Sequence, residues 1–128
     1  MRFLLDTNVF LWIISDDERL SPGARAVYLD QETDPLLSMA SVWEMMIKAS
    51  LRKLDLPPRP GSFIRDQLRQ TACTVLDITI DHCVMVRTLP FHHKDPIDRL
   101  IVAQALAERI PVLSANRAMA RYGVKNLF

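Results

Sequence analysis

The sequence predicts an α/β fold in which a parallel β-sheet is covered by helices on both faces. Short apolar segments alternate along the chain with segments typical of helices, which is the pattern of repeated βα units. The chain has 128 residues, 49% of them hydrophobic, so it is long enough to bury one core. We therefore expect residues 1–128 to form a single domain.

The N-terminal part predicts a strand and two helices. Phe3–Leu5 is a short apolar run and predicts a buried strand. Val9–Ser15 predicts a helix, although its Val, Ile and Trp residues also suit a strand. A second helix is expected to run to Leu29, with Ser21 as its N-cap and Pro22 at its first helical position.

The remainder continues the alternation. Thr74–Ile78 is rich in β-branched residues and predicts a strand, and Asp95-Pro96 marks the start of a long helix that ends near Arg109. The other expected elements are strands over Leu36–Ser38, Pro111–Ser114 and Val124–Phe128, and helices over Ser41–Leu51, Ser62–Thr71, Ile80–Thr88 and Arg117–Ala120.

Composition excludes several classes of protein. The formal net charge is +1, so any contact with nucleic acid must come from a local patch. The longest apolar stretch, Val9–Ile14, falls far short of the roughly 20 residues of a membrane span, so we expect a cytoplasmic protein with no membrane partner. Cys73 and Cys83 lack zinc-site spacing, and only three glycines occur, with no Gly-rich phosphate-binding loop.

Acids and an amide occur where strands end and helices begin. Asp6 follows the first strand, Asn116 follows the strand near residue 113, Asp95 and Asp98 open the long helix, and Glu44 lies early in another helix. Each has an ordinary structural explanation. Asp6, Asp95 and Asn116 are suited to capping, Asp98 complements a helix dipole, and Glu44 completes an S-x-x-E capping box with Ser41.

Their shared position predicts a metal site. Ligands of open parallel sheets bind beyond the carboxyl ends of the strands, where these residues are expected to meet. Clustered carboxylates repel unless a cation lies between them, and an all-oxygen ligand set suits Mg²⁺ or Mn²⁺. We expect Asp6 and Asp98 to hold the ion, and Glu44 and Asp95 to position or deprotonate a water molecule. This is the chemistry of a metal-dependent nuclease. Candidates for contact with the phosphates of a nucleic acid are Lys48, Arg52, Arg99 and Arg117.

Four segments resemble a known family in order and spacing. "LLDTNVFLW", "SMASVWEMMIKASLRKLDLP", "LPFHHKDPIDRLIVAQALAE" and "PVLSANRAMARYGV" are similar to PIN-domain ribonucleases of the VapC type, toxins of type II toxin–antitoxin systems. The resemblance runs from Phe3 to the C-terminus. It implies a three-layer α/β/α PIN-like domain with a central parallel sheet, and a Mg²⁺- or Mn²⁺-dependent endoribonuclease. It also implies a cognate VapB-type antitoxin, and we expect a homodimer or a hetero-oligomer of toxin and antitoxin.

The resemblance also assigns residues. The three acids of the family match Asp6, Glu44 and Asp98, with Asp95 as a nearby acid, and Thr7 matches a hydroxyl that hydrogen-bonds near the first Asp.

Asn116 departs from the pattern, because this subtype usually has Asp there. Asn keeps the shape but loses the charge, so metal binding is expected to be weaker. The alternative is a non-catalytic PIN-like RNA-binding module that has lost metal binding through Asn116.

The apolar residues Val9–Ile14, together with Trp43, Met45 and Met46, also allow two interpretations. They are either core residues or the lining of a groove for an antitoxin helix or a second subunit. Phosphatases of the haloacid-dehalogenase type and receiver domains fit badly, because Asn8 stands where the former need a second Asp, and Asp6 lacks the acidic neighbour that the latter need.

Overall fold

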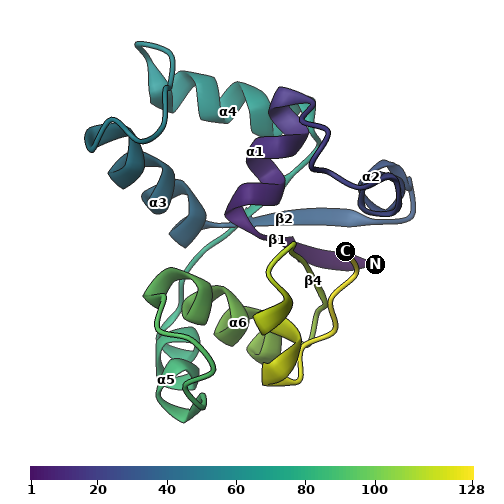
Figure 1. Ribbon diagram of the computed structural model, residues 1–128, viewed down its shortest axis with the longest axis vertical. Coiled ribbons are helices and arrows are strands. Elements are labelled where there is room, and N and C mark those ends of the chain that lie inside the picture. The colour runs from purple at the N-terminus through teal and green to yellow at the C-terminus, as the bar shows by residue number, and fades with distance from the viewer.

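A four-stranded parallel sheet forms the centre of the computed structural model, which describes residues 1–128 (Figure 1). Its strands are β1 (Arg2–Leu5), β2 (Asp34–Ser38), β3 (Thr74–Leu76) and β4 (Val112–Leu113), in the order β3-β2-β1-β4. Every pairing in the sheet is parallel. The predicted α/β class with a central parallel sheet is confirmed.

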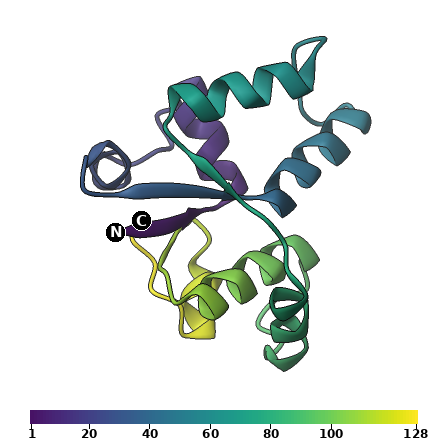
Figure 2. The ribbon, with the colours of Figure 1, turned by 180° about the vertical axis from the view of Figure 1, so that it is seen from behind.

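Helices cover both faces of this sheet (Figures 1 and 2). One face carries α1 (Thr7–Ser15), α2 (Pro22–Leu29), α3 (Met39–Ser50) and α4 (Pro60–Gln70). The other carries α5 (Ile80–Thr88), α6 (Pro96–Glu108) and the 3₁₀ helix η1 (Arg117–Tyr122). The arrangement is the expected three-layer α/β/α sandwich.

Strand β1 divides the hydrophobic core in two. Phe3 and Leu5 pack with Phe10 of α1 in one cluster, whereas Leu4 packs with Ile101 of α6 in the other. Successive side chains of a strand point to opposite faces, so an uninterrupted apolar strand serves both layers at once. The central position of β1 in the sheet explains why no polar residue lies between Arg2 and Asp6.

Helix α3 begins earlier than expected. Its N-cap is Ser38, whose hydroxyl accepts a hydrogen bond from the backbone N–H of Ala40 at 3.0 Å. Ser41 therefore lies within the helix, where it is fully buried. The predicted capping box of Ser41 and Glu44 does not form, which leaves the Glu44 carboxylate available for other contacts.

Other differences concern short or terminal segments. The predicted strand over Val124–Phe128 is reduced to one isolated parallel bridge between Val112 and Asn126, and β3 ends at Leu76 instead of Ile78. The predicted turn from Arg117 continues to Tyr122. None of the helices combines the length and the apolar character that crossing a membrane requires.

Candidate active site

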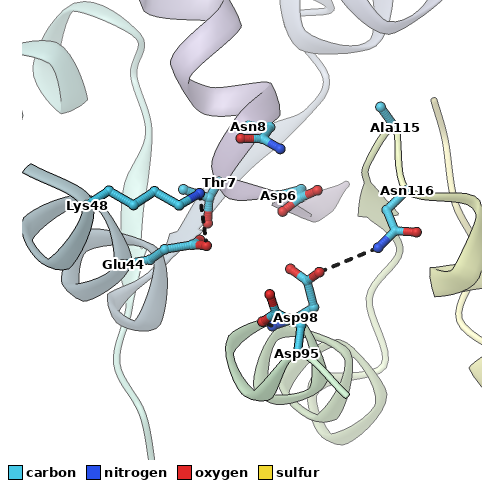
Figure 3. Close-up of a pocket in the computed structure, with 9 residues that line it drawn as sticks. All are labelled: Asp6, Thr7, Asn8, Glu44, Lys48, Asp95, Asp98, Ala115 and Asn116. Carbon is cyan, nitrogen blue, oxygen red and sulfur yellow. Dashed lines mark hydrogen bonds and ion pairs between the residues drawn. The ribbon is translucent and has the colours of Figure 1, made fainter. Parts of the chain in front are cut away.

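Four segments converge on one pocket of about 370 Å³ at the carboxyl edge of the sheet (Figure 3). They are the end of β1, helix α3, the start of α6 and the turn after β4. The pocket is lined by Asp6, Thr7, Asn8, Glu44, Lys48, Asp95, Asp98, Ala115 and Asn116. The structure therefore brings together all four predicted acids, together with Thr7 and Asn116.

Asp6 is buried at the floor of the pocket. It occupies the N-cap position of α1, but its side chain makes no capping hydrogen bond. Instead its Oδ2 accepts a hydrogen bond from the Ser114 hydroxyl at 2.8 Å. Burial raises the pKa of the Asp6 carboxyl, against the opposing effect of the hydrogen bond from Ser114. The capping explanation for Asp6 is wrong, because Ser114 holds the carboxylate toward the pocket.

Thr7 connects β1 to the helix that carries Glu44. Its hydroxyl donates a hydrogen bond of 2.8 Å to the Ser41 hydroxyl, one turn before Glu44. One Glu44 oxygen, Oε2, pairs with Lys48 Nζ at 3.2 Å, whereas the other, Oε1, is buried without any hydrogen-bond partner. A buried carboxylate oxygen without a protein partner is unfavourable, so this oxygen is suited to a hydrogen-bond donor or a cation from outside the chain.

Asp95 and Asp98 have different tasks at the start of α6. Asp95 is the N-cap, and its Oδ1 accepts the backbone N–H groups of Ile97 at 2.9 Å and Asp98 at 3.0 Å. Asp98 points into the pocket (Figure 3). Burial, reinforced by the charges of Asp6, Asp95 and Glu44, raises the pKa of Asp98 to about 7. Without a cation, burial and the neighbouring charges therefore favour the protonated form of Asp98.

Asn116 both caps a helix and contacts this acid. Its Oδ1 accepts the backbone N–H of Ala118 at 3.0 Å, which caps η1 and orients the amide. The amide Nδ2 is then the atom that donates to Asp98 Oδ2, at 3.4 Å. Where an Asp would add a fourth carboxylate, Asn116 supplies a hydrogen-bond donor.

The donor set fits a hydrated divalent cation better than a closed cage. As the side chains stand, no three His, Cys, Asp or Glu residues are close enough to enclose an ion. Mg²⁺ keeps several of its waters and needs only one or two carboxylates directly. A divalent cation in the pocket would give the Glu44 oxygen a partner and would lower the raised pKa of Asp98.

The four basic residues expected to contact RNA divide into three groups. Lys48 lines the pocket, whereas Arg52 and Arg117 are exposed but lie outside its lining. Arg99 is only 5% exposed, and the prediction that it contacts RNA is wrong. Its guanidinium donates to backbone carbonyls in the α5–α6 connection and lies 4.0 Å from the centre of the Phe91 ring. The reason is helix geometry: a step of one residue from Asp98 turns the side chain by about 100°.

The sequence did not reveal the contacts of two side chains that hold the pocket residues in place. Ser114 and Ser41 are both buried, and each hydrogen-bonds to a residue of the pocket. For Ser114 a signal existed, since it is a polar residue directly after a buried strand, as Asp6 is. For Ser41 the S-x-x-E pattern gave a different explanation, and only the fold reveals its contact with Thr7.

A family model for the PIN domain matches residues 3–125. The fold is similar to VapBC2 from Rickettsia felis bound to a DNA fragment from its promoter (TM-score 0.73, 16% identity, 98% of this chain and 97% of that chain covered). It is also similar to VapBC-1 from nontypeable Haemophilus influenzae (TM-score 0.65, 17% identity, 98% of this chain and 96% of that chain covered). A third similar structure is FitAcB from Neisseria gonorrhoeae (TM-score 0.64, 22% identity, 100% of this chain and 97% of that chain covered).

No match was found among curated proteins. The structural similarities, at these identities, concern the fold. The family model covers nearly the whole chain, including all four acids of the pocket, and the chain therefore belongs to the PIN domain family.

Proposed function

We propose that this PIN domain is a divalent-metal-dependent endoribonuclease. The observation that carries the proposal is the convergence of Asp6, Glu44 and Asp98, from three separate segments, in one pocket. A merely structural cluster would neutralise its acids with nearby bases. Here Lys48 is the one lysine or arginine that pairs with an acid of the pocket, and it leaves Glu44 Oε1 without a partner. Carboxylates kept together at such a cost are typical of functional sites.

The acids have distinct roles in this proposal. Asp6 and Asp98 hold Mg²⁺ or Mn²⁺, since each carboxylate has one oxygen without a hydrogen bond. When bound, the ion supplies a Lewis acid that polarises a phosphate oxygen and favours attack by water. Glu44 Oε1 is the free base of the pocket and accepts the proton of the attacking water. Asp95 keeps Oδ2 free at the exposed rim, where it orients that water.

Lys48 is the residue best placed to bind the scissile phosphate. Its ammonium lies beside Glu44 inside the pocket, so it contributes a positive charge close to the acids (Figure 3). Arg52 and Arg117 remain candidates for phosphates farther along the RNA, because their exposed side chains flank the elements that carry Lys48 and Asn116.

We also propose that the protein is a VapC-type toxin with a VapB-type antitoxin. Two of the similar structures are VapBC proteins. A second pocket of about 410 Å³, lined in part by Trp12, Leu54 and Phe63, shares Asn8 and Lys48 with the acid pocket. An apolar antitoxin helix bound there would obstruct access to the acids. We also propose a homodimer, because Trp43 of α3 is 60% exposed and large aromatic side chains are enriched at protein interfaces.

RNA cleavage by the purified chain tests the proposal. We expect total tRNA and rRNA to be cut in the presence of Mg²⁺ or Mn²⁺ and to stay intact in EDTA. Gel analysis should show discrete internal fragments, as an endonuclease produces, and not a ladder that shortens from one end. If no RNA is cut with any divalent metal, while calorimetry shows no Mn²⁺ binding, the non-catalytic RNA-binding alternative is favoured.

Replacing Asn116 by Asp should tighten Mn²⁺ binding about tenfold. A unit charge about 4 Å from another contributes about 1 kcal/mol even in bulk water, and more against a divalent ion in a partly buried pocket. The Asp oxygen can still cap η1, so the fold should be kept. Calorimetric titration with Mn²⁺ measures the effect, with Gln70→Glu as a control, because Gln70 is exposed at the end of α4 and does not line the pocket. Equal affinities in Asn116→Asp and the parent chain would show that this side chain does not face the ion.

A further inference from the structure

A buried histidine nitrogen without a partner lies next to the acid pocket. His93 belongs to the connection between α5 and α6, and its side chain is 18% exposed. Its Nε2 is buried without a hydrogen-bond partner, and the nearest acid oxygen is Oδ2 of Asp98 at 3.8 Å. A buried imidazole N–H that is left unsatisfied is unfavourable, so its orientation toward an acid of the site needs an explanation.

The segment that carries His93 is fixed to α6 by Arg99. Arg99 Nη1 donates to the Pro90 carbonyl at 2.8 Å, and Nη2 donates to the Leu89 carbonyl at 3.2 Å. The guanidinium also lies over the Phe91 ring. Because Asp98 is the neighbour of Arg99 in the same helical turn, these contacts hold the loop and the acid in a fixed relation.

Tyr122 determines which nitrogen of His93 carries the proton. The Tyr122 oxygen accepts the Arg99 Nη1–H at 3.3 Å and the His93 backbone N–H at 3.2 Å. Its two lone pairs are then used, and its own proton has one partner, Nδ1 of His93 at 2.9 Å. Nδ1 is therefore the acceptor, and the neutral imidazole carries its hydrogen on Nε2, the atom that faces Asp98.

We infer that His93 is a positioning residue for the metal site, whose Nε2–H orients the Asp98 carboxylate through Oδ2 and leaves Oδ1 to face the pocket. Asn116 Nδ2 donates to the same oxygen at 3.4 Å, so Asn116 and His93 both present a donor to Oδ2 of Asp98. The 3.8 Å separation shortens to a hydrogen bond when the carboxylate moves by roughly an ångström. This inference rests on the proposed metal-dependent function.

The tautomer can be tested without any metal. In ¹⁵N NMR spectra of the metal-free protein, His93 should show a protonated Nε2 and an unprotonated Nδ1. Tyr122→Phe removes the hydroxyl that fixes this state, and it should shift the two nitrogen resonances toward each other as the tautomers mix. A protonated Nδ1 in the parent protein would overturn the inference.

The positioning role is tested by Mn²⁺ calorimetry on matched variants. His93→Phe should weaken Mn²⁺ binding about tenfold, the lower range for loss of a group that orients a metal ligand. His93→Gln keeps an amide donor near the position of Nε2, and it should stay within about threefold of the parent affinity. His92→Phe is the control. The centre of the His92 ring lies 4.8 Å from the centre of the Tyr122 ring, so His92 shares this packing, but it makes no contact with Asp98.

The outcomes separate this inference from the proposed function. Absence of Mn²⁺ binding by the parent protein overturns both. Parent binding with an unchanged affinity in His93→Phe overturns the positioning role alone. If His93→Phe does not fold, His93→Asn replaces it, since the shorter amide cannot reach Asp98. Equal affinities in His93→Asn and His93→Gln would then overturn the inference.

Discussion

The Asp6→Asn variant is expected to fold normally and to lose RNA cleavage by at least a hundredfold, roughly the effect of removing one electrostatic group from an active site. Asn is isosteric with Asp, and its carbonyl oxygen can accept the hydrogen bond that Ser114 donates at 2.8 Å. Burial opposes the charge of Asp6, so its loss does not weaken the fold. The variant therefore separates the chemistry of the site from its architecture.

Cleavage of the RNA that the parent protein cuts, at saturating Mn²⁺, measures this loss. Asp81→Asn is the matched control, because Asp81 is an exposed acid in the first turn of α5 and does not line the pocket. Both variants should be purified by the same procedure, so that a contaminating nuclease would appear in each. Cleavage by Asp6→Asn at the rate of the control would refute the assignment of Asp6.

The metal-free protein is expected to lose stability as the pH rises from 5 to 8. Asp98 has a folded-state pKa of about 7, compared with 3.8 for an unperturbed Asp. Folding therefore favours the protonated form, and this contribution is complete below pH 4 and is lost as the pH rises through 7. A shift of about three pKa units corresponds to at most about 4 kcal/mol of unfolding free energy.

Asp98→Asn should remove most of this pH dependence. In EDTA at pH 8 the variant should be more stable than the parent by a few kcal/mol, whereas near pH 4 the two should be similar. Urea denaturation across the pH range measures the difference, with Asp81→Asn again as the control. Mn²⁺ should stabilise the parent at pH 8 but not Asp98→Asn. A metal-free parent whose stability rises between pH 5 and 8 would contradict the prediction.

The acids of the site make the metal-free fold less stable than it would be without them. Asp6, Glu44 and Asp98 are acids that the metal-free protein keeps wholly or partly buried in one pocket, and the pKa of both Asp6 and Asp98 is raised by burial. Such arrangements are retained where activity needs them and lost where it does not. Stability gained on removing an acid is therefore evidence of function in its own right.

Local sequence signals predicted most of the fold. The apolar run before Asp6, the Ser-Pro start of α2 and the Asp-Pro start of α6 each act through their immediate neighbours, and all three appear in the structure as expected. The predicted strand over Val124–Phe128 is reduced to a single bridge, because only Asn126 pairs with the short edge strand β4, at Val112. Contacts of that kind leave no local pattern.

The same distinction applies to the pocket. The acids were predicted because each stands at a strand end or a helix start, where topology directs it to the carboxyl edge. The burial of Arg99 was missed because a charged residue beside Asp98 gives no sign that backbone carbonyls and Phe91 surround it. The bond from Ser114 to Asp6 joins residues 108 positions apart, and only the folded chain brings them together.

The order in which the pocket residues occur along the chain has a consequence for synthesis. A nascent chain exposes Asp6 and Glu44 well before Asp98 and Asn116 have left the ribosome, because the α6 and β4 segments that complete the pocket are made after β1 and α3. If the protein cuts RNA, an unfinished chain has no assembled site with which to attack the ribosome and tRNAs that are translating it. Activity would begin only after the α6 and β4 segments have folded onto the rest of the domain.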